Sequence, residues 1–260
     1  MSRRRLASVA AVLLVLAGCS SSTQTRVIVG AGTSLVDSRF MAEIVDAYGE
    51  IEPSTQLSVV GVSSAEAIAL AQAGEADVIV THNREALDEY MAQHSESVRS
   101  VAFASSFFIV ADPAIEIAAA SLEDALSVIA ARAYPFVSRD DGSGTNVAEL
   151  AAWDRTGIDP SVEPWYIRTG TGMGATLQVA DQRHATTLAE HGAFLASMSV
   201  LSLVPVANTT IDNPYDLTVI DPTDNRAAAA FAEWMTSPDG VAAIGQANSR
   251  LFDQQVYVAP

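Results

Sequence analysis

The sequence predicts an α/β fold with a largely parallel sheet. Strand-like apolar runs alternate with helix-like segments from residue 26 onward, and this alternation is typical of α/β proteins. Three clusters rich in Gly, Ser and Thr, at residues 30–34, 140–145 and 170–174, follow strand-like runs and lead into helix-like segments. Open α/β sheets bind ligands beyond the carboxyl ends of their strands, so we expect the three clusters to converge there.

Short runs rich in Val, Ile and aromatic residues are the expected strands. They cover residues 26–29, 57–60, 77–80, 107–110, 136–138, 165–167, 201–206 and 217–220. Apolar residues at helical spacing and capping residues indicate the helices. The expected helices cover residues 38–49, 63–73, 85–94, 121–132, 146–155, 175–183 and 224–236, and a last helix begins at Ser237 with Pro238 in its first position.

The charge of the chain limits its partners. The net charge is −17 at pH 7, and the sequence contains no Lys. Nucleic-acid phosphates require clustered basic residues, so nucleic acid is excluded, and the negative surface favours a soluble monomer. Helix N-termini can still bind an anion at close range through unpaired N–H groups and the positive end of the helix dipole. The three clusters therefore predict a receptor for a small oxyanion.

The N-terminus predicts the compartment. Basic residues 3–5 precede an apolar stretch at residues 6–16, which is short for a membrane span. The Leu-Ala-Gly-Cys tetrad that ends at Cys19 resembles the bacterial lipobox. We expect residues 1–18 to be a signal peptide, Cys19 to carry the lipid, and residues 19–25 to be a tether, which makes the protein extracytoplasmic and anchored to the cell membrane. Cys19 is the single Cys, so a disulfide within the chain is excluded.

Arg139 is the most specific candidate for a ligand-binding residue, because a guanidinium can donate two hydrogen bonds to one oxyanion. The alternative is a surface ion pair of Arg139 with Asp140 or Asp141. The hydroxyls of Thr33 and Ser34 can donate to an anion, or serve only as helix caps. The complete expected set is Thr33, Ser34, Ser64, Arg139, Ser143, Gly144, Thr145, Thr171, Gly172 and Met173.

A secreted hydrolase is the alternative from another class. Ser143 lies between two glycines before a helix, as in a nucleophile elbow, but the complete G-x-S-x-G motif is absent. Only His184 and His191 come after Ser143 in the chain as possible general bases. His82 is better explained as a structural residue. The four His and one Cys lack zinc spacing. We therefore expect a binding protein with no cofactor and no metal.

The chain resembles the tungstate-binding substrate-binding proteins of ABC transporters. The resemblance rests on Thr33-Ser34 and on residues 74–82, 136–145 and 165–177, and continues through Asn213-Pro214-Tyr215. It implies a two-lobed fold of the type II periplasmic-binding-protein kind, with a hinge between the lobes. Lobe 1 would comprise residues 26–110 and 216–260, and lobe 2 residues 111–215. The closed form would deliver its anion to an ABC permease driven by an ATPase.

The identity of the anion remains open among tungstate, molybdate and phosphate. The segment Gly30-Ala31-Gly32, which begins the first cluster, is similar to the corresponding segment of phosphate-binding receptors. Phosphate keeps a proton near neutral pH and benefits from a carboxylate acceptor, whereas tungstate and molybdate require only donors. Where phosphate receptors place an Asp after the third strand, this chain has Thr81-His82-Asn83. Asp37, Asp140 or Asp141 could still supply an acceptor, and the resemblance favours tungstate.

Overall fold

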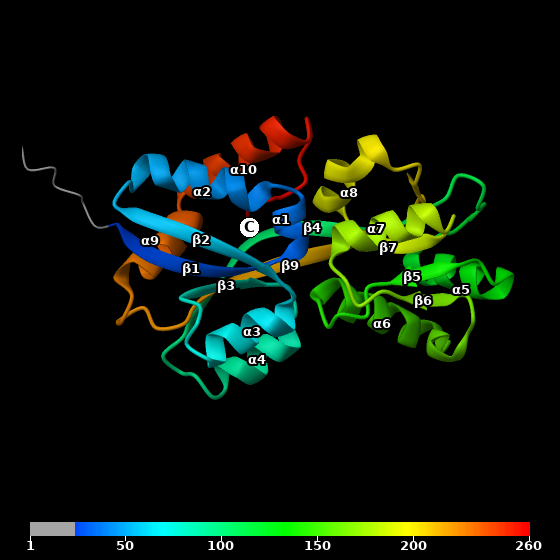
Figure 1. Ribbon diagram of the computed structural model, residues 1–260, viewed down its shortest axis with the longest axis horizontal. Helices are drawn as coiled ribbons and strands as arrows, with labels where there is room; N and C mark the ends of the chain where they lie inside the picture. The colour runs from blue at the N-terminus through cyan, green and yellow to red at the C-terminus, as the bar shows by residue number, and fades with distance from the viewer. Residues whose placement is uncertain (1–23) are drawn as a thin grey trace, which may run out of the picture.

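The computed structural model describes residues 24–260, which form two halves arranged along the long axis of the molecule (Figure 1). The expected signal peptide and the lipidation site Cys19 lie outside these residues. A single sheet runs through both halves in the order β2-β1-β3-β9-β4-β7-β5-β6, and β8 pairs with β4. Among residues 24–260, no helix is both long enough and apolar enough to cross a membrane.

The first half is a sheet with helices on both faces (Figure 1). Strand β1 lies between β2 and β3 and is parallel to both. Helices α2, α9 and α10 pack on one face, and α3 and α4 on the other. The bounds are β1 Thr25–Gly32, α1 Thr33–Asp37, α2 Phe40–Ile51, β2 Thr55–Val62, α3 Ser64–Gln72, β3 Val78–Thr81, α4 Arg84–Met91, α9 Arg226–Met235 and α10 Pro238–Leu251.

The second half repeats this layered arrangement. Strand β5 is parallel to β6 and to β7. Helices α5 and α6 pack on one face, and α7 and α8 on the other. The bounds are α5 Leu122–Arg132, β5 Phe136–Ser138, α6 Gly144–Thr156, β6 Tyr166–Arg168, α7 Met173–Gln182, β7 Thr186–Glu190, α8 His191–Ser197 and β8 Val204–Pro205, with short 3-10 helices at Pro160–Val162 and Met198–Val200.

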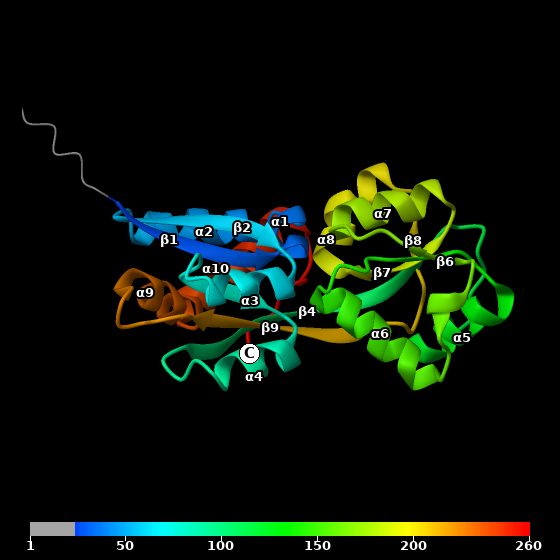
Figure 2. The same ribbon diagram turned by 60° about the horizontal axis from the view of Figure 1, so that its bottom comes forward.

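Two long antiparallel strands connect the halves (Figure 2). Strands β4 (Val98–Ala111) and β9 (Ile211–Val219) pair from Val98↔Val219 to Phe107↔Ile211, with an irregularity between Val101 and Phe103. In the first half β9 pairs with β3, and in the second half β4 pairs with β7. Both connections between the halves therefore belong to the sheet. The sheet contains parallel and antiparallel pairs, so the expectation of a largely parallel sheet is wrong.

The alternation of strands and helices is confirmed, and the largest differences concern the second half. The expected strand at residues 201–206 is reduced to β8, and β7 with α8 was not expected from the sequence. The five residues of β7 read Thr-Thr-Leu-Ala-Glu, which is not an apolar run, yet all are buried. The hydroxyls of Thr186 and Thr187 donate to the carbonyls of Pro135 and Val137. These bonds remove the cost of burying polar side chains.

Aromatic residues join the C-terminus to the core of the first half. The ring of Phe40 on α2 stacks on Tyr257 with centroids 4.0 Å apart, and it meets the edge of Phe103 on β4 at 5.0 Å. All three side chains are buried. The segment after α10 is thus fixed against the strand that connects the halves.

We predict that Phe40→Ala lowers the free energy of unfolding by about 3–5 kcal/mol, because it leaves a cavity among buried rings. Ile51→Ala is the matched control on the same helix, since Ile51 is 56% exposed, and it should change stability by less than about 0.5 kcal/mol. Urea unfolding followed by circular dichroism measures both values. Equal effects of the two substitutions would contradict this description of the core.

Candidate functional site

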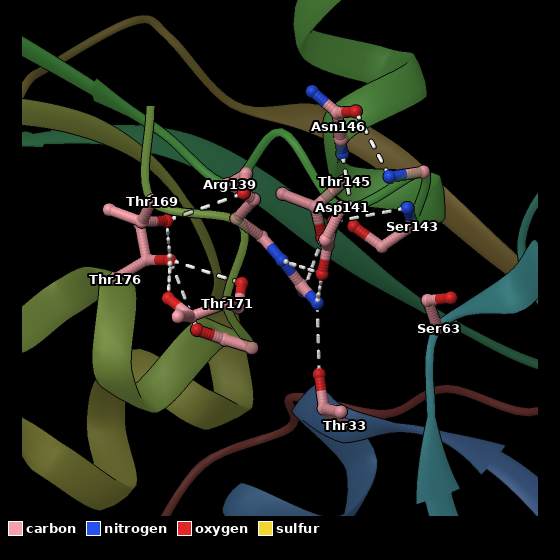
Figure 3. Close-up of polar contacts among 12 residues, drawn as sticks. Thr33, Ser63, Arg139, Asp141, Ser143, Thr145, Asn146, Thr169, Thr171 and Thr176 are labelled. Atoms are coloured by element: carbon pink, nitrogen blue, oxygen red, sulfur yellow. Dashed lines mark hydrogen bonds and ion pairs between the residues drawn. The ribbon is translucent and has the colours of Figure 1, made fainter. Parts of the chain in front are cut away.

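Arg139 is the buried centre of the site, directly after β5 (Figure 3). Its side chain is 2% exposed, and no other basic side chain within residues 24–260 is buried. Nε and Nη2 donate to Oδ2 of Asp141, and the Nε bond is 3.1 Å long. Nη1 lies 3.4 Å from Oγ1 of Thr145, and Nη2 donates to Oγ1 of Thr33 at 2.9 Å. The ion pair with Asp141, which was the alternative interpretation of Arg139, exists, but it is inside the protein and not on its surface.

The loop after Arg139 presents the N-terminus of α6 to the site. Asp140 and Gly142 adopt positive φ angles of 48° and 66°, which reverse the chain within a few residues. Oδ1 of Asp141 accepts from the N–H of Ser143 at 3.1 Å, and Oγ of Ser143 caps α6 by accepting from the N–H of Asn146. The N–H groups of the first helical turn have no partners within the helix. Those of Gly144 and Thr145 are therefore available to a ligand.

The third cluster joins the site through the start of α7. A Cβ atom on Gly172 would lie only 3.3 Å from the side chain of Thr33, and the N–H of Gly174 donates to Oδ2 of Asp37 at 2.9 Å. The start of α7 in the second half thus meets α1 in the first. Met173 is fully buried and packs in the core of the second half, so its side chain faces away from the site and only its N–H can contribute.

Thr171 belongs to a separate group of hydroxyls on the flank of the site. Its Oγ1 lies 3.4 Å from Oγ1 of Thr176, which also contacts Thr169 at 3.2 Å. Figure 3 shows these three threonines beside Arg139, with no bond drawn between them and the guanidinium. Oγ1 of Thr169 instead donates to the carbonyl of Ser138 at 3.0 Å. The group therefore fixes the loop before α7.

The two serines of the first half differ in position. Ser34 is fully buried on α1, next to Thr33, and its Oγ has no partner within the described residues. Ser64 is the first residue of α3, and its Oγ lies 3.5 Å from the N–H of His82 as an acceptor. Ser63 caps α3 and forms a capping box with Glu66, as expected of a cap. Ser34 is therefore a buried hydroxyl that a ligand could use, while Ser64 supports His82.

His82 forms the contact between the halves next to Gly144. Its ring stacks on Tyr215 at 4.7 Å and 13°, and its Nδ1 lies 2.8 Å from Oδ1 of Asn213. A Cβ atom on Gly144 would collide with the His82 ring and lie 2.7 Å from its Nε2, so this approach requires a glycine. Neither Asn213 nor Tyr215 was among the residues expected in the site. They appeared only within the family resemblance, because no local pattern marks their proximity to His82.

Burial controls the charge of two groups around the site. Burial, together with the nearby charge of Arg139, lowers the pKa of His82 to about 4 against the opposite effect of its bond to Asn213, so this imidazole is neutral near pH 7. Burial raises the pKa of Glu149 on α6 to about 7, although Ser138 and Tyr166 donate to its carboxylate at 2.7 and 2.6 Å. Ser138 directly precedes Arg139, so Glu149 lies behind the loop that carries the guanidinium.

The arrangement around Ser143 is that of a helix cap and not of a nucleophile. Within residues 24–260, no His is hydrogen-bonded to Ser143. His184 pairs with Asp112 at 2.7 Å, and His191 lies 3.4 Å from Ser106. A serine nucleophile requires an adjacent base. The geometry therefore gives no support to the hydrolase alternative.

A family model describing a PBP superfamily domain matches residues 20–239. The chain belongs to the PBP superfamily. The tungstate-binding protein TupA of Peptoclostridium acidaminophilum is 28% identical over 99% of this chain and 97% of its own length. The structure of the tungstate ABC transporter protein from Geobacter sulfurreducens is 28% identical, covers 85% of this chain and 98% of that chain, and has a TM-score of 0.77.

A more distant structure shares only the fold. The ABC-type phosphate transport receptor from Vibrio cholerae is 16% identical, with a TM-score of 0.61 over 90% of this chain and 100% of that chain. Together these similarities confirm the predicted type II periplasmic-binding-protein fold and the resemblance to tungstate-binding proteins. They place the chain among the solute-binding proteins of transporters, not among enzymes.

We predict that Glu149→Gln flattens the pH dependence of stability between pH 5 and pH 8. The raised pKa means that the folded state holds a proton which the unfolded state has released, so wild-type stability falls as the pH rises from about 4.5 through 7. The loss amounts to about 3 kcal/mol at most, and a neutral Gln avoids it. Thermal unfolding across this pH range measures the slope.

Glu89→Gln is the control, because Glu89 is exposed on α4. It should leave the slope unchanged. A Glu149→Gln variant whose stability falls with pH as steeply as that of the wild type would show that Glu149 does not titrate in this range.

Proposed function

We propose that this chain captures a tetrahedral oxyanion, most specifically tungstate, and delivers it to an ABC importer. The observation that carries this proposal is the buried guanidinium of Arg139, which reaches Thr33 in the opposite half at 2.9 Å. An oxyanion placed there would receive charged hydrogen bonds from Arg139 and neutral ones from the first turns of α1 and α6. The tungstate-binding relative matches almost the whole chain, which supports the choice of ligand.

Closure of two lobes about a hinge would bring the donors together. The first lobe, residues 26–110 and 216–260, supplies Thr33 and Ser34. The second lobe, residues 111–215, supplies Arg139 with Ser143, Gly144 and Thr145, and backbone N–H groups at Gly172 and Met173 complete the shell. The strands β4 and β9 are the hinge in this proposal, because both connections between the halves run through them. Ser64 and Thr171 lie outside this shell, where they hold His82 and the loop before α7 in place.

The carboxylates near the site favour an anion without a proton. Asp141 uses Oδ2 for Arg139 and Oδ1 for the N–H of Ser143, and Asp37 accepts from Gly174. Both oxygens of Asp141 and one oxygen of Asp37 are thus occupied, and the groups that remain are mainly donors, which suits tungstate or molybdate. Phosphate is the second candidate. With Nδ1 bonded to Asn213, a neutral His82 keeps Nε2 as an acceptor, to which a protonated phosphate could donate.

The cellular setting belongs to the same proposal. Residues 1–18 would be removed as a signal peptide, and Cys19 would hold the mature monomer on the outer side of the cell membrane through its lipid and the tether 19–25. The partners would be the ABC permease and its ATPase. Proteins of the tungstate-binding family, including the Geobacter sulfurreducens structure, support the transporter setting.

The proposal predicts tight binding of tungstate by residues 20–260. Isothermal titration with tungstate, molybdate, sulfate and phosphate at neutral pH measures it. Tungstate should bind and phosphate should give no heat, because the free groups are mainly donors. Binding of phosphate alone would transfer the assignment to a phosphate receptor, and the absence of heat with all four anions would contradict an oxyanion site.

Arg139→Ala should weaken tungstate binding by well over tenfold, because the loss of a charged hydrogen bond costs about 2 kcal/mol. Arg139→Lys keeps the charge but loses the planar fork, and it should show an intermediate affinity. Arg132→Ala removes an exposed arginine of the same half and should bind as the wild type does. Normal tungstate binding by a folded Arg139→Ala variant would refute the assignment of the site.

A further inference from the structure

Three buried polar atoms between the halves have no hydrogen-bond partner within residues 24–260. They are Oγ of Ser34, Nδ2 of Asn213 and the hydroxyl of Tyr215. Their residues are 0%, 2% and 0% exposed. Folded proteins rarely leave buried donors unpaired, because the lost contact with water is not compensated. Three such atoms in one place indicate that something outside the chain accepts from them.

Asn213 is held in one orientation by His82. The amide oxygen Oδ1 lies 2.8 Å from Nδ1 of His82, which makes that ring nitrogen the donor and Oδ1 the acceptor. The amide nitrogen Nδ2 is therefore left as a pure donor. The same His82 ring stacks on Tyr215, so one imidazole positions both side chains of β9.

These side chains lie next to the residues of the anion site. A Cβ atom on Gly32 would lie 3.9 Å from Cε1 of Tyr215 and 4.0 Å from Nε2 of His82, and Gly32 directly precedes Thr33. Burial and the charge of Glu190 raise the pKa of the Tyr215 phenol. Asn213, Arg139 and Ser34 all lie close enough to lower it, so these groups gather around one hydroxyl. Both halves therefore direct donors to one place.

We propose that Asn213 and Tyr215 are specificity-determining residues, whose Nδ2 and hydroxyl groups donate to oxygens of the bound anion from the strand that connects the halves. This inference rests on the proposed function and deepens it. His82 acts as a positioning residue, because it orients both donors by stacking and by its bond to Asn213.

The chemistry of this pair selects among oxyanions. An amide N–H group can only donate, so the oxygen that it meets must carry a free lone pair. Each oxygen of tungstate or molybdate fulfils this condition near neutral pH. A protonated phosphate oxygen in the same position would place its hydrogen against that of the donor, which a buried site disfavours. Phosphate is therefore restricted to orientations in which its unprotonated oxygens meet both donors, whereas tungstate is not. The pair therefore favours a fully ionised tetrahedral anion.

Two conservative variants test the inference by isothermal titration with tungstate and with phosphate. Tyr215→Phe removes one hydroxyl and keeps the ring on His82, and it should lower tungstate affinity about tenfold. Asn213→Asp keeps the acceptor for His82 but replaces the donor by a carboxylate oxygen. It should lower tungstate affinity more than a hundredfold at neutral pH, because the new charge repels the anion. Tyr48→Phe, in a buried tyrosine of α2, is the matched control and should bind as the wild type does.

The outcomes separate this inference from the proposed function. Folded Tyr215→Phe and Asn213→Asp variants that bind tungstate as tightly as the wild type would overturn the inference, while the loss of binding in Arg139→Ala would leave the proposed function in place. If Asn213→Asp does not fold, the tungstate affinity of Tyr215→Phe, compared with that of Tyr48→Phe, tests the inference by itself. A wild-type protein that binds none of the four oxyanions would refute both proposals at once.

Discussion

The burial of one guanidinium between two halves of the protein constrains the rest of the structure. A buried charge is tolerated only if it is paired and hydrogen-bonded, and Arg139 meets this condition through Asp141, Thr145 and Thr33. Asp141 in turn accepts from Ser143, which caps α6. The ion pair is neutral as a unit, so attraction for an anion in this acidic chain depends on short-range donors. For that reason the helix N-termini must lie close to Arg139.

The two halves have their own cores and are connected through the sheet strands β4 and β9. Separate buried clusters lie on each face of the sheet in each half. Movement about these connecting strands would leave the cores largely intact and would change mainly the contacts between the halves. Glycines lie at those contacts: Gly144 against His82 and Gly172 against Thr33. The absence of a side chain at these two glycines permits the halves to approach each other closely without steric collision.

The interior keeps negative charge away from the anion in two ways. Asp141, the carboxylate next to Arg139, has one oxygen occupied by the guanidinium and the other by the N–H of Ser143. Carboxyl groups farther inside, Glu149 and Glu190, have a raised pKa because they are buried, which favours their uncharged forms. Hydroxyls of Ser138 and Ser105 donate to these two groups. Acidic residues thus strengthen the scaffold without adding acceptors to a site that must present donors.

The local sequence was enough to predict the alternation of strands and helices, the caps at Ser63, Ser121 and Ser237, and the loop that carries Arg139, because helix starts and tight turns depend on neighbouring residues. It did not determine which distant segments meet. Thr33 and Arg139 are separated by 106 positions, and His82 and Asn213 by 131. Only the sheet order, with β9 and β4 between the halves, brings these pairs together. Strand β7 was not predicted because its threonines do not form an apolar run. They can be buried only because their hydroxyls donate to carbonyls of Pro135 and Val137, and tertiary packing alone brings these groups together.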